Sequence, residues 1–300
     1  MSRRTTSLLT RREVIAGGVA LAAGAMGARA LSGQGGRERP FAPAAAIEAS
    51  VGGRLGVAAL NTGTSERLSH RADERFPMCS TFKWLLAAQV LARVDAGEES
   101  LDRAVRYGPA DLLEYSPVTR ENIESGGLTI AELSAAAVQI SDNTAANLLL
   151  ATVDGPEGFT AFLRTLGDPT TRLDRTEPEL NEAAPEDPRD TTTAAAMLED
   201  LRTVLLGEVL SPASRERLID WMVTSTTGKS RLRAGLPAGW RVGDKTGTCG
   251  RGFANDVAIA WPPGREPILI AAYLAGAEAS FDDCSTALAE VARGVAQAFG

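Results

Sequence analysis

The segment from Ser80 to Ala96, STFKWLLAAQVLARVDA, decides the fold class because it predicts a long helix near the start of the chain. Residues that set the helical period recur three or four positions apart, which places them on one face. Gly97 follows the last of them and is a typical helix end. The positions that carry this spacing are Phe82, Leu85, Leu86, Gln89, Val90 and Val94.

Strands are predicted on both sides of a helical stretch, and this order indicates the architecture. Two strands, Arg54–Asn61 and Glu66–Arg71, precede the first long helix. Further helices are expected at Thr129–Gln139, Thr144–Ala151, Pro156–Leu166, Thr192–Leu206 and Pro212–Thr224, then strands at Trp240–Lys245, Asp256–Trp261 and Ile268–Leu274, and a closing helix at Asp283–Phe299. We therefore expect an α/β (α+β) fold with an antiparallel sheet built from both chain ends and an inserted all-helical part.

This order also predicts how the chain divides. A sheet subdomain would comprise about residues 47–78 and 225–300, and a helical subdomain about residues 79–224, together one catalytic unit within residues 31–300. Residues 31–46 are rich in Gly, Pro and Ala, which indicates a loose lead-in. The segment Arg172–Asp190 has no periodicity and holds three prolines, so it is expected to be a functional loop.

Composition excludes several classes of function. The 300 residues are 44% hydrophobic and 23% charged, which is typical of a globular chain. The formal net charge of −7 argues against nucleic acid as the main partner, because phosphate binding needs a basic surface. Three cysteines and one histidine argue against a structural zinc cluster. That histidine, His70, has no nucleophile motif beside it and is interpreted as a strand or surface residue, so no metal or organic cofactor is implied.

Residues 1–30 have the features of an export signal. A basic start is followed by a short apolar run, Val14–Ala25, and by the cleavage pattern Ala28-Arg29-Ala30. The pair Arg11-Arg12 favours a twin-arginine signal over an ordinary secretory signal. The apolar run is too short to anchor the protein in a membrane. Export to the periplasm or out of the cell is expected.

Three short motifs carry the candidate chemistry. In Ser80-Thr81-Phe82-Lys83 the lysine lies three positions after the serine, on the same helix face, so its amine can reach the hydroxyl. Ser141-Asp142-Asn143 lies between two helices, and Lys245-Thr246-Gly247 ends a predicted strand. Taken singly, they fit a helix cap with a surface lysine, a polar cap and a strand-end turn. Taken together, in a chain with only three lysines, they have a chance probability of about one in ten thousand.

These motifs match the signature of the serine β-lactamases and penicillin-binding proteins. The segment Arg175-Thr-Glu-Pro-Glu-Leu-Asn181 adds an E-x-x-x-N pattern that is similar to the omega loop of class A β-lactamases. The chain therefore resembles a class A β-lactamase over essentially its whole mature length. The resemblance implies hydrolysis of penicillins, cephalosporins and carbapenems through a serine acyl-enzyme, which would give antibiotic resistance, with a small-molecule β-lactam as substrate.

The resemblance also implies catalytic roles. Ser80 would attack the lactam carbonyl, and either Lys83 or Glu177 acting through a water would take its proton. Ser141 would pass a proton to the leaving nitrogen. Glu177 and Asn181 would activate the water that clears the acyl-enzyme. The alternative for Glu177 is a solvated loop acid.

Substrate binding would use residues around the same serine. The backbone N–H groups of Ser80 and Thr248 would form the oxyanion hole. Asn143 would hold the substrate's side-chain amide, and Tyr115 would lie at the site entrance or merely pack there. The groups expected at the substrate carboxylate are Lys245, Thr246, Gly247, Thr248 and Arg231.

The omega loop and the cysteines carry the remaining expectations. Arg175 and Asp190 would form an ion pair across the loop ends, and Pro178 makes a cis peptide possible after Glu177. Cys79 and Cys249 flank converging motifs, and the sequence around Cys249 is similar to carbapenemases in which this pair is bridged; two buried free thiols are the alternative. Cys284 would be the free, buried thiol.

Two other functions share the three motifs. A D,D-peptidase should lack the Glu177 and Asn181 pair, and it is usually tethered to a membrane. A β-lactam sensor domain would acylate without turnover and would normally follow a transmembrane helix. The sequence shows no heptads or repeats, so a monomer is expected.

Overall fold

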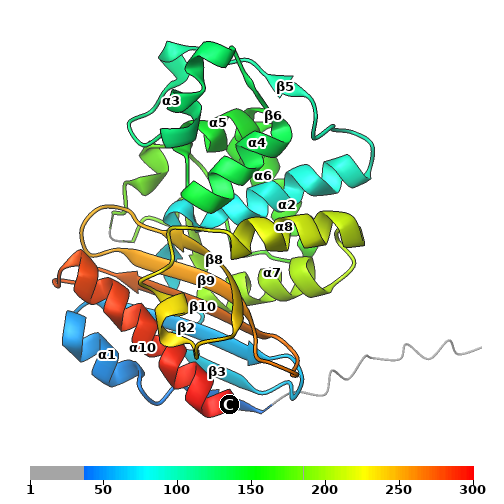
Figure 1. Cartoon of the computed structure of the whole chain (residues 1–300). Helices are drawn as coiled ribbons and strands as arrows, with labels where there is room; N and C mark the ends of the chain where they lie inside the picture. Colours follow the sequence, from blue (N-terminus) through cyan, green and yellow to red (C-terminus); the bar gives the residue numbers. More distant parts are fainter. Residues whose placement is uncertain (1–36, 185) are drawn as a thin grey trace, which may run out of the picture. The chain divides into compact units, whose positions relative to one another are not determined.

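A six-stranded sheet organises the part of the chain that this computed structural model describes, residues 37–184 and 186–300 (Figure 1). The strand order is β1-β3-β2-β10-β9-β8. The antiparallel sheet built from both chain ends is confirmed, because β2 pairs with β10 along its whole length; only the short edge pair β1–β3 is parallel. The strands are β1 (Glu38–Pro40), β2 (Arg54–Asn61), β3 (Arg67–His70), β8 (Arg241–Gly247), β9 (Ala254–Trp261) and β10 (Ile268–Ala275).

Alternating side chains of the sheet build two separate cores. In β10, Ile270 belongs to one core and Ala271 to the other, as expected for a strand buried on both faces. One core lies between the sheet and the helices α1 (Ala44–Val51) and α10 (Phe281–Phe299). The other core joins the opposite face to α2 (Phe82–Asp95), α7 (Ala194–Leu206) and α8 (Pro212–Val223) (Figure 1).

The helix predicted from the opening segment is central to the helical part. Every residue of α2 from Phe82 to Leu91 is buried, because other helices surround its first turns. The remaining helices of the described chain are α3 (Pro117–Glu121), α4 (Ile130–Ala135), α5 (Asn143–Ala151), α6 (Gly155–Leu166) and α9 (Leu232–Gly235). Two small strand pairs complete it: β4 (Arg75–Pro77) with β7 (Thr191–Thr193), and β5 (Ala104–Val105) with β6 (Leu128–Thr129).

One sequence expectation was wrong, and one expected helix is present but changes its helical type partway. Residues 37–46 are not a loose lead-in, since they form β1 and the start of α1; Phe41 is only 3% exposed and packs over Gly294 of α10. The helix expected at Thr129–Gln139 is α4 followed by a π-helical segment, Ala136–Ile140. Segments of this kind are often found at functional sites, and this one leads directly into Ser141.

Other expectations concern the chain ends and His70. The predicted export signal at residues 1–30 lies outside the described residues. In the ranges 37–184 and 186–300, no helix combines the length and the apolar character needed to cross a membrane. His70 is a strand residue of β3, as expected, and its Nε2 lies 3.4 Å from Glu48 Oε1.

Candidate active site

Ser80 lies at the point where the chain enters α2. Cys79 has a positive φ of 47°, and the short 3-10 turn Cys79–Thr81 leads directly into the helix. The N-terminus of a helix favours the negative charge that develops when a serine attacks a carbonyl. The Ser80 hydroxyl is 3.4 Å from Glu177 Oε1, to which it donates a long hydrogen bond.

Lys83 connects the Ser141–Asn143 motif to Glu177. Its side chain is fully buried, and its ammonium lies 2.8 Å from Glu177 Oε1. Nζ also donates to the carbonyl oxygen of Ser141 at 3.0 Å and to Asn143 Oδ1 at 2.6 Å. Burial lowers the pKa of Lys83, and the Glu177 carboxylate opposes that shift. A lysine of lowered pKa is better able to accept a proton near neutral pH.

The segment Ser141–Asn143 is held in place by its central aspartate. Ser141 has a left-handed backbone, with φ 66°, where the π-helical segment ends. Asp142 caps α5 by accepting from the backbone N–H of Ala145 at 2.9 Å, and it also accepts from the N–H groups of Val118 and Thr119 at 3.0 Å. The cap explanation of this motif is therefore correct for Asp142, while its neighbours face the site.

The end of β8 places Lys245 on the other side of Ser141. Its Nζ donates to Ser141 Oγ at 3.0 Å and to the carbonyl of Thr246 at 2.8 Å. Burial, and then the charge of Lys83, hold the pKa of Lys245 well below its usual value. Gly247 packs so closely that an added Cβ would lie 2.6 Å from the carbonyl oxygen of Met78. This position therefore requires glycine.

The omega loop brings Glu177 into the site. Glu177 is 1% exposed, and Asn181 Nδ2 donates to its Oε2 at 2.6 Å. At the loop neck, Arg175 Nε donates to Asp190 Oδ2 at 2.6 Å, so the expected ion pair is present. The peptide between Glu177 and Pro178 is cis, as the proline allowed.

Asn147 is a site residue that the sequence analysis did not single out. Its Nδ2 donates to the carbonyl of Glu177 at 2.8 Å, and its Oδ1 accepts from the N–H of Glu177 at 3.0 Å. These two hydrogen bonds fix the backbone of Glu177 to α5. The spacing was a usable signal, because Asn147 lies four positions after Asn143 and therefore on the same helix face.

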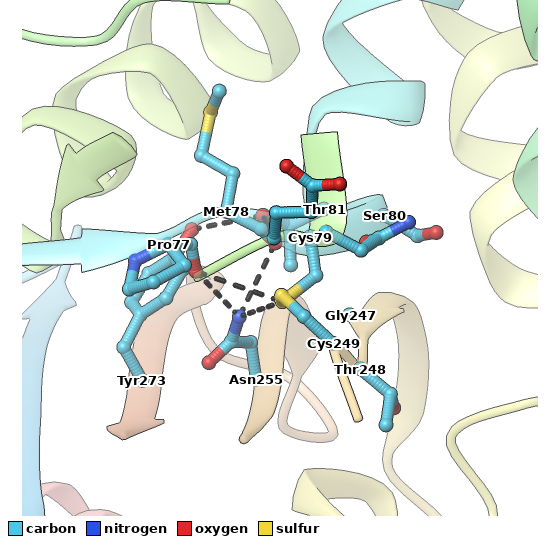
Figure 2. Close-up of a disulfide and its surroundings, with 12 residues drawn as sticks. Pro77, Met78, Cys79, Ser80, Thr81, Gly247, Thr248, Cys249, Asn255 and Tyr273 are labelled. Carbon is cyan, nitrogen blue, oxygen red and sulfur yellow. Dashed lines mark hydrogen bonds between the residues drawn. A yellow bond between two sulfur atoms is a disulfide. The ribbon is translucent and has the colours of Figure 1, made fainter. Parts of the chain in front are cut away.

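A disulfide joins Cys79 to Cys249, with 5.4 Å between their Cα atoms, so the bridged alternative is confirmed (Figure 2). Beside it, Asn255 Nδ2 donates to the carbonyl oxygens of Pro77 and Met78, at 2.9 and 3.2 Å (Figure 2). These contacts tie the nucleophile turn to β9 and to the end of β8. Cys284 is free and buried, as expected.

Arg231 is buried beside the end of β8. Its Nη1 donates to the carbonyls of Gly247 and Asn255, both at 2.8 Å, and its Nη2 donates to Thr248 Oγ1 at 2.7 Å. Its exposed fraction is only 2%, yet it still lines the site cavity. This position is consistent with the prediction that Arg231 lies where the substrate carboxylate would bind.

Part of this group of residues lines one cavity of about 390 Å³. Tyr115 is half exposed and forms part of its wall, as an entrance residue would. Thr227 and Phe281 also line it, although no sequence motif marked them. The complete lining is Ser80, Tyr115, Ser141, Asn143, Asn181, Thr227, Arg231, Thr246, Thr248 and Phe281. The cavity is lined by the Ser80 hydroxyl and by Arg231, and the buried groups Glu177, Lys83 and Lys245 contact its lining residues Ser80, Ser141 and Asn143. This arrangement suits acyl transfer to a substrate that carries an anionic group.

Comparisons with known proteins agree with this geometry. The profile of the Beta-lactamase enzyme family matches residues 42–299. Beta-lactamase AST-1 of Nocardia asteroides is 50% identical over 256 residues, which are 85% of this chain and 82% of the relative. The carbapenem-hydrolyzing beta-lactamase KPC of Klebsiella oxytoca is 52% identical over 232 residues, 77% of this chain and 79% of the relative. The solved structure of an ancestral (GNCA) class A beta-lactamase superposes with a TM-score of 0.83 at 61% identity, covering 85% of this chain and 98% of that one.

Proposed function

The chain belongs to the class A β-lactamases, the serine hydrolases that open β-lactam rings, and from that premise we propose a role for each site residue and a substrate range. The observation that carries the proposal is the contact between Asn181 and Glu177, 2.6 Å from Nδ2 to Oε2. It supplies what the related acylating proteins would lack, namely a means of removing the acyl group.

Acylation begins with attack of Ser80 Oγ on the lactam carbonyl carbon. The hydroxyl proton passes to the ion pair of Lys83 and Glu177, whose charged atoms are 2.8 Å apart. Glu177 is nearest to the hydroxyl, while the lowered pKa of Lys83 makes its amine a competent acceptor of the proton. The backbone N–H groups of Ser80 and Thr248 stabilise the oxyanion that forms.

The lactam nitrogen then leaves with a proton from Ser141. Ser141 Oγ already accepts a hydrogen bond from Lys245 Nζ at 3.0 Å, so the lost proton can be replaced from that ammonium. The low pKa of Lys245, caused by burial and by Lys83, favours this transfer. Ring opening leaves the acyl group bound to Ser80 as an ester.

Deacylation uses the loop carboxylate. A water held between Glu177 and the Asn181 amide attacks the ester carbonyl, and Glu177 takes the proton of that water. The bond between the acyl carbon and Ser80 Oγ then breaks, and Glu177 returns the proton to Ser80 Oγ as the opened product leaves. A D,D-peptidase or a sensor domain would stop at the ester. A buried carboxylate, 1% exposed and hydrogen-bonded to an amide, also argues against the alternative of a solvated loop acid.

Substrate orientation divides between two sides of the cavity. The substrate carboxylate binds at the end of β8, to Lys245, the hydroxyls of Thr246 and Thr248, and Arg231, with Gly247 allowing the close approach. Asn143 Oδ1 is occupied by Lys83 Nζ, so its amide NH₂ remains to donate to the side-chain amide of the substrate.

Carbapenems are proposed to be among the substrates. The Cys79–Cys249 disulfide fixes the nucleophile turn against the end of β8. The relative KPC, which is named for carbapenem hydrolysis, is 52% identical over 232 residues. Penicillins and cephalosporins are proposed as the other substrate classes.

The remaining proposals concern the whole protein. We propose that the Arg11-Arg12 signal exports it, that it acts as a monomer, and that it needs no cofactor or nucleic acid. The division into a sheet subdomain, about 47–78 and 225–300, and a helical subdomain, about 79–224, also stays a proposal. Size-exclusion chromatography with light scattering tests the monomer, and an Arg11→Lys/Arg12→Lys variant tests the export route.

Carbapenem absorbance followed over time, with mature protein at one hundredth of the substrate concentration, tests the function. Loss of all the substrate supports deacylation and carbapenem turnover together. Loss of one equivalent followed by a stop contradicts carbapenem turnover. A penicillin control then separates a narrower β-lactamase, which consumes all the penicillin, from a protein that only acylates.

A further inference from the structure

Two exposed aromatic side chains line the site cavity. In the described part of the chain, three large apolar side chains are exposed, namely Tyr115 (50%), Leu206 (37%) and Phe281 (57%). Tyr115 and Phe281 both line the cavity that contains Ser80, whereas Leu206 belongs to α7 and does not line it. Exposed apolar surface that gathers at a cavity is typical of a place where an apolar part of a ligand binds.

The start of α10 holds Phe281 in a defined position. Phe281 is the first residue of that helix and directly follows the cap residue Ser280. Ser280 Oγ accepts from the Asp283 N–H at 3.2 Å and donates to Asp283 Oδ2 at 2.6 Å, so hydrogen bonds close the turn that carries Phe281. The Arg231 guanidinium lies over the Phe281 ring, 5.2 Å from Cζ to the ring centroid, which is a cation–π contact. The exposed part of the ring is therefore ordered before a substrate binds.

Phe281 and Tyr115 belong to different parts of the cavity lining. Phe281 contacts Arg231, whose Nη2 donates to Thr248 Oγ1 at 2.7 Å, so Phe281 lies at the proposed carboxylate-binding end of β8. The Tyr115 carbonyl accepts from the Asn143 N–H at 3.0 Å, so Tyr115 lies by the residue proposed to hold the side-chain amide of the substrate. Phe281 is therefore beside the part of the substrate that carries the carboxylate.

The chemistry of bicyclic β-lactams places a second substituent next to that carboxylate. In cephalosporins and carbapenems, a double bond joins the ring carbon that bears the carboxylate to a neighbouring carbon, and this neighbour carries a variable group. The double bond fixes the first atom of the group in the plane of the alkene. When the carboxylate is bound at Arg231, a flat group at that position would lie next to the exposed part of the Phe281 ring.

We propose that Phe281 is a specificity-determining residue, which selects cephalosporins and carbapenems that carry a flat aromatic group next to the carboxylate. The group packs against the exposed part of the Phe281 ring, and this contact removes apolar surface of both partners from water. The inference rests on the proposed binding of the substrate carboxylate at Arg231. It assigns Phe281 no part in the chemistry at Ser80.

Nitrocefin and cephalothin are suitable probes, because both carry a thienylacetamido side chain and they differ only in the group next to the carboxylate. That group is a flat dinitrostyryl group in nitrocefin and a small acetoxymethyl group in cephalothin. The quantity measured is the ratio of kcat/KM for nitrocefin to kcat/KM for cephalothin in the full mature protein. Comparing this ratio between variants cancels the intrinsic reactivity of each substrate.

We expect Phe281→Ala to lower the ratio about tenfold, the size expected for one aromatic contact together with the apolar area that it buries. Phe281→Tyr, which restores a flat ring, should keep the ratio within about twofold of the parent value. Leu206→Ala is the matched control, because it removes an exposed apolar side chain that does not line the cavity, and its ratio should equal that of the parent.

Three results would overturn the inference. An unchanged ratio in Phe281→Ala does so even where both substrates lose activity, because an equal loss means that the ring only positions Arg231. The same fall in Leu206→Ala would show a general effect of lost apolar surface. A tenfold fall in Phe281→Tyr would show that the flat ring is not what the substrate contacts.

Two further measurements keep the outcomes distinct. Thermal unfolding shows whether each variant is folded, and Phe281→Leu is the second variant if Phe281→Ala does not fold, since leucine still packs against Arg231 but has no flat face. A parent protein that consumes only one equivalent of both cephalosporins would refute the proposed function, and this inference with it. A parent that turns over both substrates, with a ratio that does not depend on residue 281, refutes this inference alone.

Discussion

The substitution Asp190→Asn tests whether the closed neck of the omega loop is what holds Glu177 in the site. Asp190 is 1% exposed, and its Oδ1 accepts from the N–H groups of Asp174 and Arg175 at 2.7 and 3.0 Å. Its Oδ2 accepts from Arg175 Nε at 2.6 Å. Asparagine can keep the first two bonds, but its NH₂ group would face the guanidinium, donor against donor. The loss therefore falls on the ion pair.

The magnitude follows from the burial of the two partners. Removing one partner of a fully buried ion pair costs about 3–5 kcal/mol. The Arg175 side chain is 14% exposed and keeps Glu182, whose Oε2 and carbonyl oxygen accept from it at 3.1 Å. Because Arg175 is partly exposed and keeps these contacts, we expect a smaller loss, a fall of about 2 kcal/mol in the free energy of unfolding. For a chain of this size that lowers Tm by roughly 4–8 °C.

The assay combines urea unfolding with burst kinetics on a chromogenic cephalosporin. A neck without its ion pair allows Glu177 to move, so we expect a burst of one equivalent and a steady-state kcat lowered about tenfold, whereas complete loss of a general base would lower it about 10²–10⁴-fold. Asp187→Asn is the control: it makes the same substitution in the same loop, at a surface pair whose Arg189 side chain is 51% exposed. It should change neither quantity.

Two results would refute the reasoning. If Asp190→Asn has the parent Tm, the ion pair does not stabilise the loop. If it loses stability but shows no burst, the neck does not control the position of Glu177. In that case the double hydrogen bond between Asn147 and the Glu177 backbone would be sufficient to hold it.

Three further predictions follow from single contacts. Glu177→Gln should acylate and then stall, giving a burst of one equivalent and a stable acyl-enzyme by mass spectrometry; unchanged turnover would exclude Glu177 as the deacylation base. Gly247→Ala should lower kcat/KM by at least about tenfold, because its Cβ would lie 2.6 Å from the carbonyl of Met78; parent-like kinetics would show that the turn can shift. The free energy of unfolding of Asp200→Asn should rise relative to that of the parent as the pH increases. Burial and the adjacent Asp168 raise the Asp200 pKa well above its usual value, so the parent loses stability as pH rises from about 4 through that raised pKa. Urea midpoints at pH 4, 6 and 8 measure this, and a difference that does not depend on pH would contradict it.

The sequence predicted the architecture because periodicity is strong where both faces of an element are buried. β10 was predicted as Ile268–Leu274 and is Ile268–Ala275. The prediction of a loose lead-in at residues 31–46 failed because no periodic apolar pattern marks that segment. Phe41, the large apolar residue nearest to α1, gives no periodic signal, and the segment is ordered by contacts with distant parts of the chain, namely the packing of Phe41 over Gly294 of α10 and the pairing of β1 with β3.

The residues of the candidate site show the same contrast between local patterns, which the sequence reveals, and long-range contacts, which it does not. The residues in short motifs, such as Ser80 and Lys245, could be placed because their spacing is local and their combination is improbable by chance. Asn255 and Thr227 could not be identified from the sequence, because what they contact is decided by the pairing of β9 with β8 and by the approach of a loop.

The burial of two lysines explains why the site depends on the complete fold. Lys83 and Lys245 are both fully buried, and a buried ammonium is costly unless other groups compensate it. Their partners come from distant segments: Lys83 bonds to Ser141, 58 positions away, and Lys245 to the same residue, 104 positions away. Lys83 gains its partners only when α2, the Ser141–Asn143 segment and the omega loop have come together, and Lys245 gains Ser141 only when β8 has packed against that segment. The same burial lowers both pKa values, so the packing that completes the fold would also prepare the two groups for the proton transfers proposed with Ser141 and Glu177.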